Sequence, residues 1–420
     1  MGKTSLLLVM GFSLIFLFFS RNYNSVSNQA VGNYFNYYDE TVAHDLAVSG
    51  ANMAANQIFL NQTWDAGYSN IQMNGGTIDV SVNIVDAVKN IREIVSEGTF
   101  SKTTKTVTVT LQPSKFSKFA YYSIYEGSSI WWKNRDTVFG PFHTQDYLRA
   151  ANHPVFGVTG YKTTIKKSLI YYTSKSADKP VFLGPFQDGE DLPLPTDGLQ
   201  PLRDAATAGG YKINQSSSSY TDKWGHTHTT VDTVYITFVK DSVTIRMGIA
   251  KPSTTYKTSD IAPNGVIYAQ GMDVRLQGTV KGQYSVVSDG SIYLDNDIVY
   301  DSNPKTDPNS TDLLGIIAQN NVLITNNSAN SHDININGTI YCQDGGFGAE
   351  SYSTRPVSGN INLLGGIVQN TRQAVGTFDP SSGTTSHGFD KRYRYDERLM
   401  TISPPLFPGT GDYEIVSWKE

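Results

Sequence analysis

The most constraining feature of this chain is an uncharged, strongly apolar run close to its N-terminus. No charged residue lies between Lys3 and Arg21, and residues 6–19 read LLLVMGFSLIFLFF. The uncharged run from Thr4 to Ser20 is 17 residues long, at the lower edge of the roughly 17–25 residues that cross a bilayer as a helix. We therefore expect residues 4–20 to lie in membrane lipid.

Three interpretations of this run are open. It is a retained anchor, the apolar part of a signal peptide cleaved near Ser25-Val26-Ser27, or a buried helix of a soluble protein. The residues that follow favour the anchor. The chain has no proline from Asn22 to Leu60, and its apolar residues recur there near helical spacing. A signal peptide has no need of such an extension, so we predict one helix that continues beyond the membrane.

Two patterns downstream indicate β-structure. Residues 77–85 alternate apolar and polar side chains, and residues 107–111 repeat the alternation after a turn at Gly98. Period-two alternation is typical of strands with one buried face. We expect these strands to lie on the helix, completing an α+β head. A chain with only 17% charged residues but 25 Tyr and 19 Phe also fits a β-rich, surface-displayed protein.

From Gly265 onward, short β-branched segments repeat. Each ends in Gln or Asp followed by Gly or Asn, and the polar positions are 19, 30, 24 and 26 residues apart. Such self-similarity predicts a repeat architecture, and variable insertions favour a parallel β-helix with Gly and Asn at its corners. The polar positions are Gln270, Asp289, Gln319, Gln343 and Gln369. We predict that the glutamines, Gln270, Gln319, Gln343 and Gln369, stack as an amide ladder, with a ligand-binding row as the alternative.

The predicted organisation has five parts. Residues 1–20 form the apolar helix, 21–112 a helix with a β-sheet, 113–262 an intermediate β-rich region, 263–375 the β-helix, and 376–420 a C-terminal cap. The intermediate region contains a short internal repeat, FGPFH at 139–143 and LGPFQ at 183–187. A solenoid end exposes unpaired backbone and needs cover, for which we expect Tyr393, Tyr395, Leu399, Phe407 and Trp418.

The order of these segments resembles the PilX-type minor pilins among the type IV pilin-like proteins. The resemblance lies in GKTSLLLVMGFSLIFLFF at the start, AVGNYFNYYDETVAHDLAVSGANMAANQIF at 30–59, and REIVSEGTFSKTTKTVTVTL at 92–111. GPFHTQDYLRAANHPVFGVTG and the C-terminal tail also resemble segments of this family, which implies a β-helix that begins near residue 138 with 190–255 as an excursion. The implied fold is mainly β with a long N-terminal α-helix, a pilin-like α+β head and a parallel β-helix.

The resemblance also implies site residues. Pilin precursors are cut after a glycine, here Gly2 or Gly11, and the fifth residue after the cut is usually Glu. It would be Leu7 or Phe16 in this chain, so the usual glutamate is absent. Small residues of the helix permit close packing, namely Gly32, Ala47, Gly50 and Ala54. We expect bulky side chains at Gly32 or Ala47 to disrupt assembly with other subunits.

The implied role is a structural, non-enzymatic protein of the bacterial cell envelope. It would cross the inner membrane once with its domain facing outward, or join a surface filament. The implied partners are other pilin-like subunits and the pilus or secretion assembly machinery, membrane lipid through residues 4–20, and surface polysaccharide. A net charge of −5 argues against nucleic acid as a partner.

The main alternative is a carbohydrate-active β-helix enzyme or a sugar-binding protein. Such a site needs clustered carboxylates, so convergence of Asp273, Asp289, Asp295, Asp297 and Asp333 would favour it.

His226 and His228 form a close pair without an evident third metal ligand, and Trp131 and Trp132 either stack on sugars or fill the core. Cys342 is the sole cysteine, which excludes an internal disulfide. We predict no cofactor, no metal and no catalytic residue.

Overall fold

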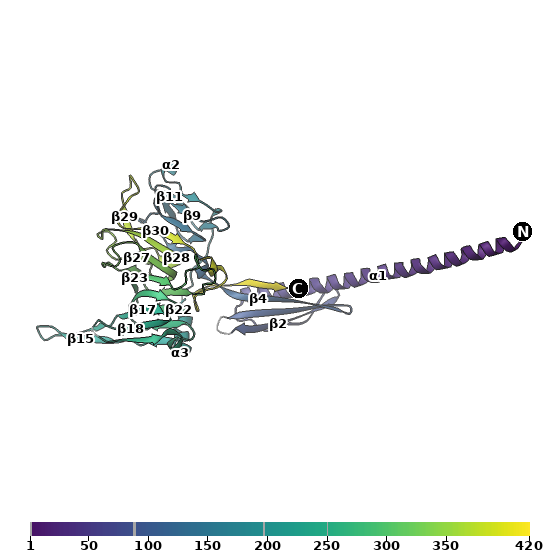
Figure 1. The fold of residues 1–420 in the computed structure, drawn as a ribbon, viewed down its shortest axis with the longest axis horizontal. Coiled ribbons are helices and arrows are strands. Elements are labelled where there is room, and N and C mark those ends of the chain that lie inside the picture. The colour runs from purple at the N-terminus through teal and green to yellow at the C-terminus, as the bar shows by residue number, and fades with distance from the viewer. Residues whose placement is uncertain (1, 87–89, 196–197, 250) are drawn as a thin grey trace. The chain divides into compact units, whose positions relative to one another are not determined.

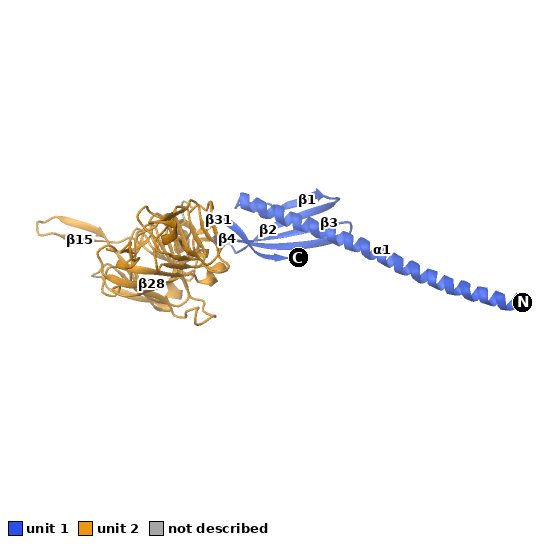
Figure 2. Cartoon of the chain, turned by 90° about the horizontal axis from the view of Figure 1, so that it is seen from above, with its two compact units in different colours: residues 1–114, 411–420 blue, residues 115–410 orange. Residues whose placement is uncertain are grey.

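The computed structural model describes residues 2–86, 90–195, 198–249 and 251–420. The chain is mainly β with a long N-terminal helix (Figure 1). It divides into two compact units, residues 1–114 with 411–420, and residues 115–410 (Figure 2). We describe each unit by itself.

The first unit is a helix packed on an antiparallel sheet. Helix α1 (Gly2–Leu60) is continuous, and its first buried residue is Ala43. It is the one helix in the described part of the chain that is long and apolar enough to cross a membrane. The sheet has the order β1-β2-β3-β4-β31, and its strands are β1 (Tyr68–Met73), β2 (Gly76–Asp86), β3 (Ile91–Phe100), β4 (Thr103–Lys115) and β31 (Gly409–Lys419).

Strand β31 changes the expected role of the C-terminus. The sequence predicts that residues 376–420 cap the β-helix, but residues 411–420 belong to the first unit. Trp418 packs there against the core that α1 forms with its sheet. An amphipathic strand near a chain end carries no local signal for which sheet it joins, so the sequence alone did not place it.

Small residues set the distance between α1 and its sheet. A Cβ at Gly50 would lie 2.4 Å from Ser96 Oγ and 2.5 Å from Ile78 Cγ2. A Cβ at Gly98 would lie 2.2 Å from the carbonyl oxygen of Ala43. Contacts under 3.0 Å require the neighbouring atoms to move. Close approach of helix and sheet therefore depends on the absence of side chains at these two positions.

Two matched glycines of α1 test this packing. We expect Gly50→Ala to destabilise the first unit by about 1–3 kcal/mol relative to Gly32→Ala, because overpacking costs that much. Both changes bring the same gain in helix propensity, about 1 kcal/mol, and a Cβ at Gly32 would meet no atom within 4 Å. Denaturant unfolding and limited proteolysis of the full chain in detergent measure the difference. Equal stability of the two variants would contradict the packing argument.

The second unit is built from two long ladders of parallel strands. The first has the order β14-β20-β22-β24-β26-β28-β5-β7-β10-β13, and every neighbouring pair is parallel. These strands are β14 (Tyr211–Ile213), β20 (Val266–Ala269), β22 (Gln283–Ser288), β24 (Leu313–Ala318), β26 (Ile334–Cys342), β28 (Val357–Thr371), β5 (Tyr121–Tyr125), β7 (Phe142–Thr144), β10 (Thr163–Ile165) and β13 (Phe186–Asp188).

The second ladder shares β26 and β28 with the first. Its order is β17-β21-β23-β26-β28-β30-β6-β9-β12, again with parallel neighbours. Its other strands are β17 (Val234–Lys240), β21 (Val274–Val280), β23 (Ile292–Tyr300), β30 (Thr385–Arg394), β6 (Thr137–Phe139), β9 (Val155–Phe156) and β12 (Val181–Phe182).

Glycines occupy the points where the two shared strands pass from one ladder to the other. Gly338 of β26 and Gly365 of β28 are register partners and both have positive φ, 152° and 147°. A Cβ at Gly365 would lie 1.9 Å from the carbonyl oxygen of Gly338. Stacked glycines thus allow adjacent strands to turn at the same place.

Shorter elements complete the second unit. Strands β23 and β25, β25 and β27, and β8 and β11 pair in parallel, whereas β17–β18–β19, β29–β30 and β15–β16 pair antiparallel, so the sheets are mixed. The bounds are β8 (Leu148–Ala150), β11 (Leu169–Tyr171), β15 (Ser217–Thr221), β16 (Thr227–Val231), β18 (Ser242–Met247), β19 (Ser253–Lys257), β25 (Val322–Ile324), β27 (Phe347–Ala349), β29 (Gly376–Phe378), α2 (Lys175–Asp178), α3 (Gln200–Gly209), α4 (Thr258–Ile261), η1 (Phe116–Lys118) and η2 (Glu397–Met400).

The strand order does not follow the chain order. Strand β28, from the C-terminal part of the unit, pairs with β5, where the unit begins: Ile367 is the register partner of Tyr121. Residues 121–188 therefore extend a stack that residues 211–371 build. The predicted boundary between 262 and 263 does not separate compact units, and residues 211–213 and 234–240 of the expected excursion belong to the ladders.

Candidate functional site

The first candidate site is the N-terminal part of α1, which its own chain leaves uncovered. Large apolar side chains of residues 6–19 are between 53% and 76% exposed. The exposure continues beyond the apolar run, with Tyr34 at 65% and Tyr37 at 71%. At 1.5 Å per residue, residues 2–42 extend about 60 Å, twice the roughly 30 Å hydrocarbon core of a bilayer. Lipid alone thus covers only about half of this surface.

The predicted packing residues of α1 divide into two groups. Gly32 is exposed, with open space around it. Ala47, Gly50 and Ala54 are buried against the sheet of the same chain. Close packing at these three residues is therefore made with the chain's own sheet, and the buried Ala47 offers no free surface to other subunits. Gly2 and Gly11 both lie within α1, and cleavage after either remains a prediction.

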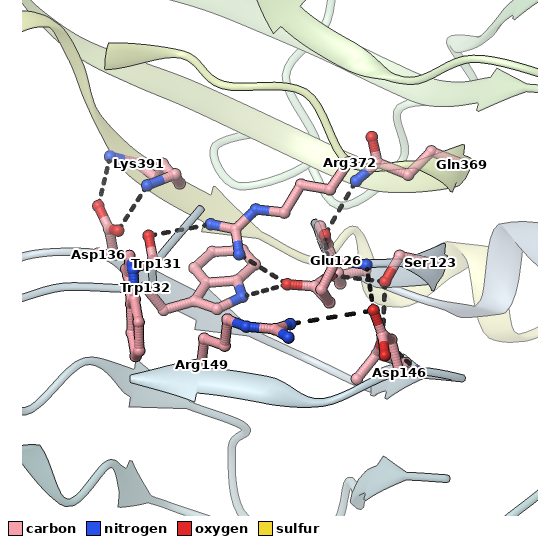
Figure 3. Close-up of polar contacts among 12 residues, drawn as sticks. Ser123, Glu126, Trp131, Trp132, Asp136, Asp146, Arg149, Gln369, Arg372 and Lys391 are labelled. Carbon is pink, nitrogen blue, oxygen red and sulfur yellow. Dashed lines mark hydrogen bonds and ion pairs between the residues drawn. The ribbon is translucent and has the colours of Figure 1, made fainter. Parts of the chain in front are cut away.

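The second candidate is a buried polar cluster around Glu126 (Figure 3). The Glu126 carboxylate is fully buried. It accepts hydrogen bonds from Tyr121 Oη at 2.5 Å, Ser123 Oγ at 2.6 Å and Trp132 Nε1 at 3.0 Å. Arg372 Nη1 lies 2.6 Å from Oε2 and forms an ion pair with it. These four donors together satisfy the hydrogen-bonding capacity of the buried carboxylate.

The Arg372 guanidinium completes this cluster. It lies 4.0 Å from the centroid of the Trp132 ring and donates from Nη2 to the Trp131 carbonyl oxygen at 3.2 Å. Burial disfavours its charge, but the adjacent Glu126 outweighs that effect and holds the pKa of Arg372 above its ordinary value. Burial, reinforced by the negative charge of Glu126, raises the pKa of Tyr121.

A second buried ion pair lies beside the cluster. Lys391 Nζ is 2.6 Å from Asp136 Oδ2, and both side chains are at least 90% buried. Burial lowers the pKa of Lys391 to about 8, although Asp136 opposes the shift. Both ion pairs join residues near the start of the second unit to residues near its end, 246 and 255 positions apart. Because β28 pairs with β5 in the same place, we assign these groups to holding that junction together.

The cluster does not have the form of an active site. Glu126 and Trp132 have no exposed surface, so a substrate does not reach them, and their hydrogen-bonding capacity is used internally. The prediction that Trp131 and Trp132 either stack on sugars or fill the core is settled for Trp132, which is core. No local pattern in the sequence indicates Glu126 or Arg372, since their pairing depends on the β5–β28 register.

The predicted amide ladder is not formed as expected. Strand register aligns Gln369 with Cys342, so Gln369 is one residue out of step with Gln343 and faces the other side of its strand. It donates to Tyr121 Oη at 2.9 Å. Gln319 and Gln343 follow aligned strand ends, but Gln343 donates to the Pro195 carbonyl oxygen and Gln319 to Asp344. Gln270 follows Ala269, whose register partner is Ser288.

An amide ladder occurs instead in the part of β26 and β28 that precedes the stacked glycines. Asn335 Nδ2 donates to Asp297 Oδ2 at 2.9 Å, and Asn362 Nδ2 donates to Asn335 Oδ1 at 3.2 Å. Asn335 and Asn362 are register partners. The signal was present in the sequence as NIN at 335–337 and 360–362, although the strands align Asn335 with the third residue of the second triplet.

The five aspartates that would indicate an enzyme are held in separate hydrogen-bond sets. Asp289 binds Arg203, Asp295 binds Arg275, and Asp297 binds Asn335. Asp273 accepts from the Ser291 amide and Asp333 from the Asn360 amide. Backbone and amide donors of Asn360 outweigh burial and lower the pKa of Asp333. These carboxylates stabilise turns and strand edges.

The histidine pair lies at the tip of the β15–β16 hairpin. Asp222 Oδ2 is 3.0 Å from His228 Nε2 and 3.3 Å from His226 Nδ1. Hydrogen bonds from His228 and the His226 amide lower the pKa of Asp222. Within the described ranges, no group of three or more His, Cys, Asp or Glu side chains is arranged to hold a metal ion.

Comparison with known proteins gives a distant structural similarity. Neither a protein-family model nor a curated protein matches the chain. Among solved structures, the chain is similar to the competence-associated pilin ComZ from Thermus thermophilus, with 12% identity and a TM-score of 0.39. The match covers 91% of this chain and 97% of that chain. A likeness this distant supports no inference about partners or activity.

Proposed function

We propose that this chain is a membrane-anchored, pilin-like structural subunit of the bacterial envelope. Residues 4–20 lie in the inner membrane, and the second unit is displayed outward from a type IV pilus or a secretion pseudopilus. The observation that carries the proposal is the uncovered length of α1, about 60 Å from residue 2 to residue 42. A simple anchor needs half of it.

The surface of α1 beyond the apolar run supports packing against other helices. Tyr34, Phe35 and Tyr37 are all more than half exposed. A soluble helix seldom leaves several large aromatic side chains in water on adjacent turns, since such patches mark interaction sites. A bundle of sister helices covers them, and in this proposal the occupants are other pilin-like subunits.

The display unit is, in this proposal, a parallel β-helix. Two parallel ladders that share β26 and β28, with stacked glycines where these strands turn, support it. The stack is discontinuous in sequence, because β5 follows β28 in space. In this proposal the unit is not an enzyme: its candidate carboxylates are bound in separate structural contacts, as described above.

Cysteine cross-linking tests the helix packing. We expect Tyr34→Cys or Tyr37→Cys to form cross-linked species above the monomer in membranes and in sheared surface material, because neighbouring helices lie within reach. Ser219→Cys, exposed in the middle of β15 of the β15–β16 hairpin, serves as the matched control and should remain monomeric. Cys342 is buried and fully desolvated, so the background is low. Monomer alone for both helix variants would overturn the proposed packing.

N-terminal sequencing of the membrane-associated protein completes the test. A mature chain that starts after Gly2 or Gly11 supports the pilin-like role. A released chain that starts after Ser27 would overturn it, since residues 4–20 would then have served only for export.

A further inference from the structure

A groove on the second unit combines amides with unpaired cations. It has a volume of about 370 Å³ and is lined by residues of β26, β28, β30 and β6 together with the loop after β23. The residues that carry the following inference are Asn335, Asn360, Asn362, Arg392, Arg394 and Lys305.

Strand register places amides and a guanidinium in one row across the groove. Asn335 pairs with Asn362, and Asn362 with Arg392. The Asn335 side chain is fixed by Asp297, and that of Asn362 by Asn335, at 2.9 and 3.2 Å. The amide groups are therefore held in place before any ligand arrives, which reduces the entropic cost of binding.

The cations of the groove lack carboxylate partners. Arg394 lies two residues beyond Arg392 on β30. Burial, reinforced by the nearby Arg394 charge, lowers the pKa of Lys305, although Asp396 opposes the shift. None of these three forms an ion pair within the described part of the chain.

The neighbouring carboxylates have other partners. Asp297 and Asp333 accept hydrogen bonds from the groove amides Asn335 and Asn360. Asp396 binds Arg398 at 2.6 Å, and Asp390 binds Lys133 and Thr385. Asp390 and Asp396 lie close enough to Arg392 and Lys305 to attract their charges, but neither forms an ion pair with them. The two guanidinium groups therefore retain N–H donors that an anionic ligand can use.

We propose that this groove binds a carboxylate-bearing saccharide chain, such as a polyuronate. The planar guanidinium groups of Arg392 and Arg394 match a carboxylate with two parallel hydrogen bonds, and the fixed amides bind hydroxyl groups, donating and accepting as needed. A groove with three cations, on a chain of negative net charge, does not carry enough positive charge to bind a nucleic-acid backbone. This proposal rests on the proposed display function, because a surface saccharide can bind only if the second unit faces outward. It adds the class of ligand that this unit binds.

Binding by the full chain in detergent micelles tests this assignment. We expect wild-type protein to bind oligogalacturonate with an affinity that falls as salt rises, and not to bind neutral malto-oligosaccharide of equal length. Arg392→Gln/Arg394→Gln should weaken binding by about tenfold per arginine, because hydrogen bonds to charged groups contribute that much. Lys305→Gln, on an exposed loop where folding is not at stake, should weaken it by severalfold.

A charge-matched control separates the groove from net charge. Lys223→Gln/Lys281→Gln removes two exposed positive charges outside the groove and should leave binding unchanged. Absence of oligogalacturonate binding, equal loss in the control, or tighter binding of duplex DNA than of oligogalacturonate would each overturn the proposal. Because the assay needs neither membrane nor filament, its failure is distinguishable from failure of the display function.

Discussion

Phe12→Arg/Phe16→Arg should move the protein out of the membrane fraction. The two positions are one helical turn apart in the middle of the apolar run, and both side chains are exposed. An arginine at the centre of a membrane helix costs about 2.5–3.5 kcal/mol. Two of them cost about 5–7 kcal/mol, which corresponds to more than a thousandfold change in partition. Fractionation of cell membranes after a high-salt wash, with detection of the full chain, measures the effect.

A matched control places the same two charges on the same helix outside the lipid. Asn24→Arg/Asn28→Arg has identical spacing, and both positions are exposed, so we expect this variant to remain in the membrane. If the first variant also resists the wash, residues 4–20 are not the anchor. A wild-type chain that is soluble and begins at residue 28 would instead support the signal-peptide alternative.

The sequence predicted the features that depend on local patterns. The continuous α1 follows from the absence of proline and the spacing of apolar residues between 22 and 60. The alternation in 77–85 and 107–111 predicted β2 and β4. A few helical turns or a few alternating residues are sufficient to predict such an element, because its own hydrophobic pattern identifies its buried face.

Features that depend on partners remote in sequence were not predictable. Small residues in α1 indicated close packing, and the alternating strands were expected to lie on the helix, but the sequence did not show which small residues face the sheet; Ala47 is one that does. The repeat marked strand ends, yet Gln369 is one residue out of register with Gln343, whereas Asn335 and Asn362 are register partners and form the ladder. A shift of one residue reverses which face a side chain occupies.

The β5–β28 junction is the clearest case. Nothing near Glu126 indicates Arg372, which lies 246 residues away. Burial of the two charges is tolerated only because they pair and are hydrogen-bonded, and that pairing exists only once strands distant in sequence are adjacent. The junction is therefore the place where a single substitution should reveal how the unit is closed.

We expect Arg372→Met to be among the most destabilising substitutions in the second unit. It keeps an apolar chain against Trp132 but leaves the Glu126 carboxylate fully buried without a counter-charge. Removing one partner of a buried pair costs about 3–5 kcal/mol, a large part of the 5–15 kcal/mol typical of a whole domain. Denaturant unfolding of the full chain in detergent, followed by circular dichroism, measures the loss. Lys166→Gln, which breaks an exposed ion pair with Asp191, should cost less than about 1 kcal/mol.

The double variant Glu126→Gln/Arg372→Met distinguishes loss of charge balance from loss of packing. Gln retains the shape of Glu but has one acceptor oxygen. In the Oε2 position this oxygen still accepts from Trp132 Nε1, and the NH2 group in the Oε1 position donates to the hydroxyls of Tyr121 and Ser123, which can rotate to accept. Gln also carries no charge that needs compensation. We therefore expect the double variant to be more stable than Arg372→Met alone, recovering at least half of the lost free energy. If the two losses instead add, the ion pair contributes only through packing, and closure of the junction depends on the strand ladder between β5 and β28.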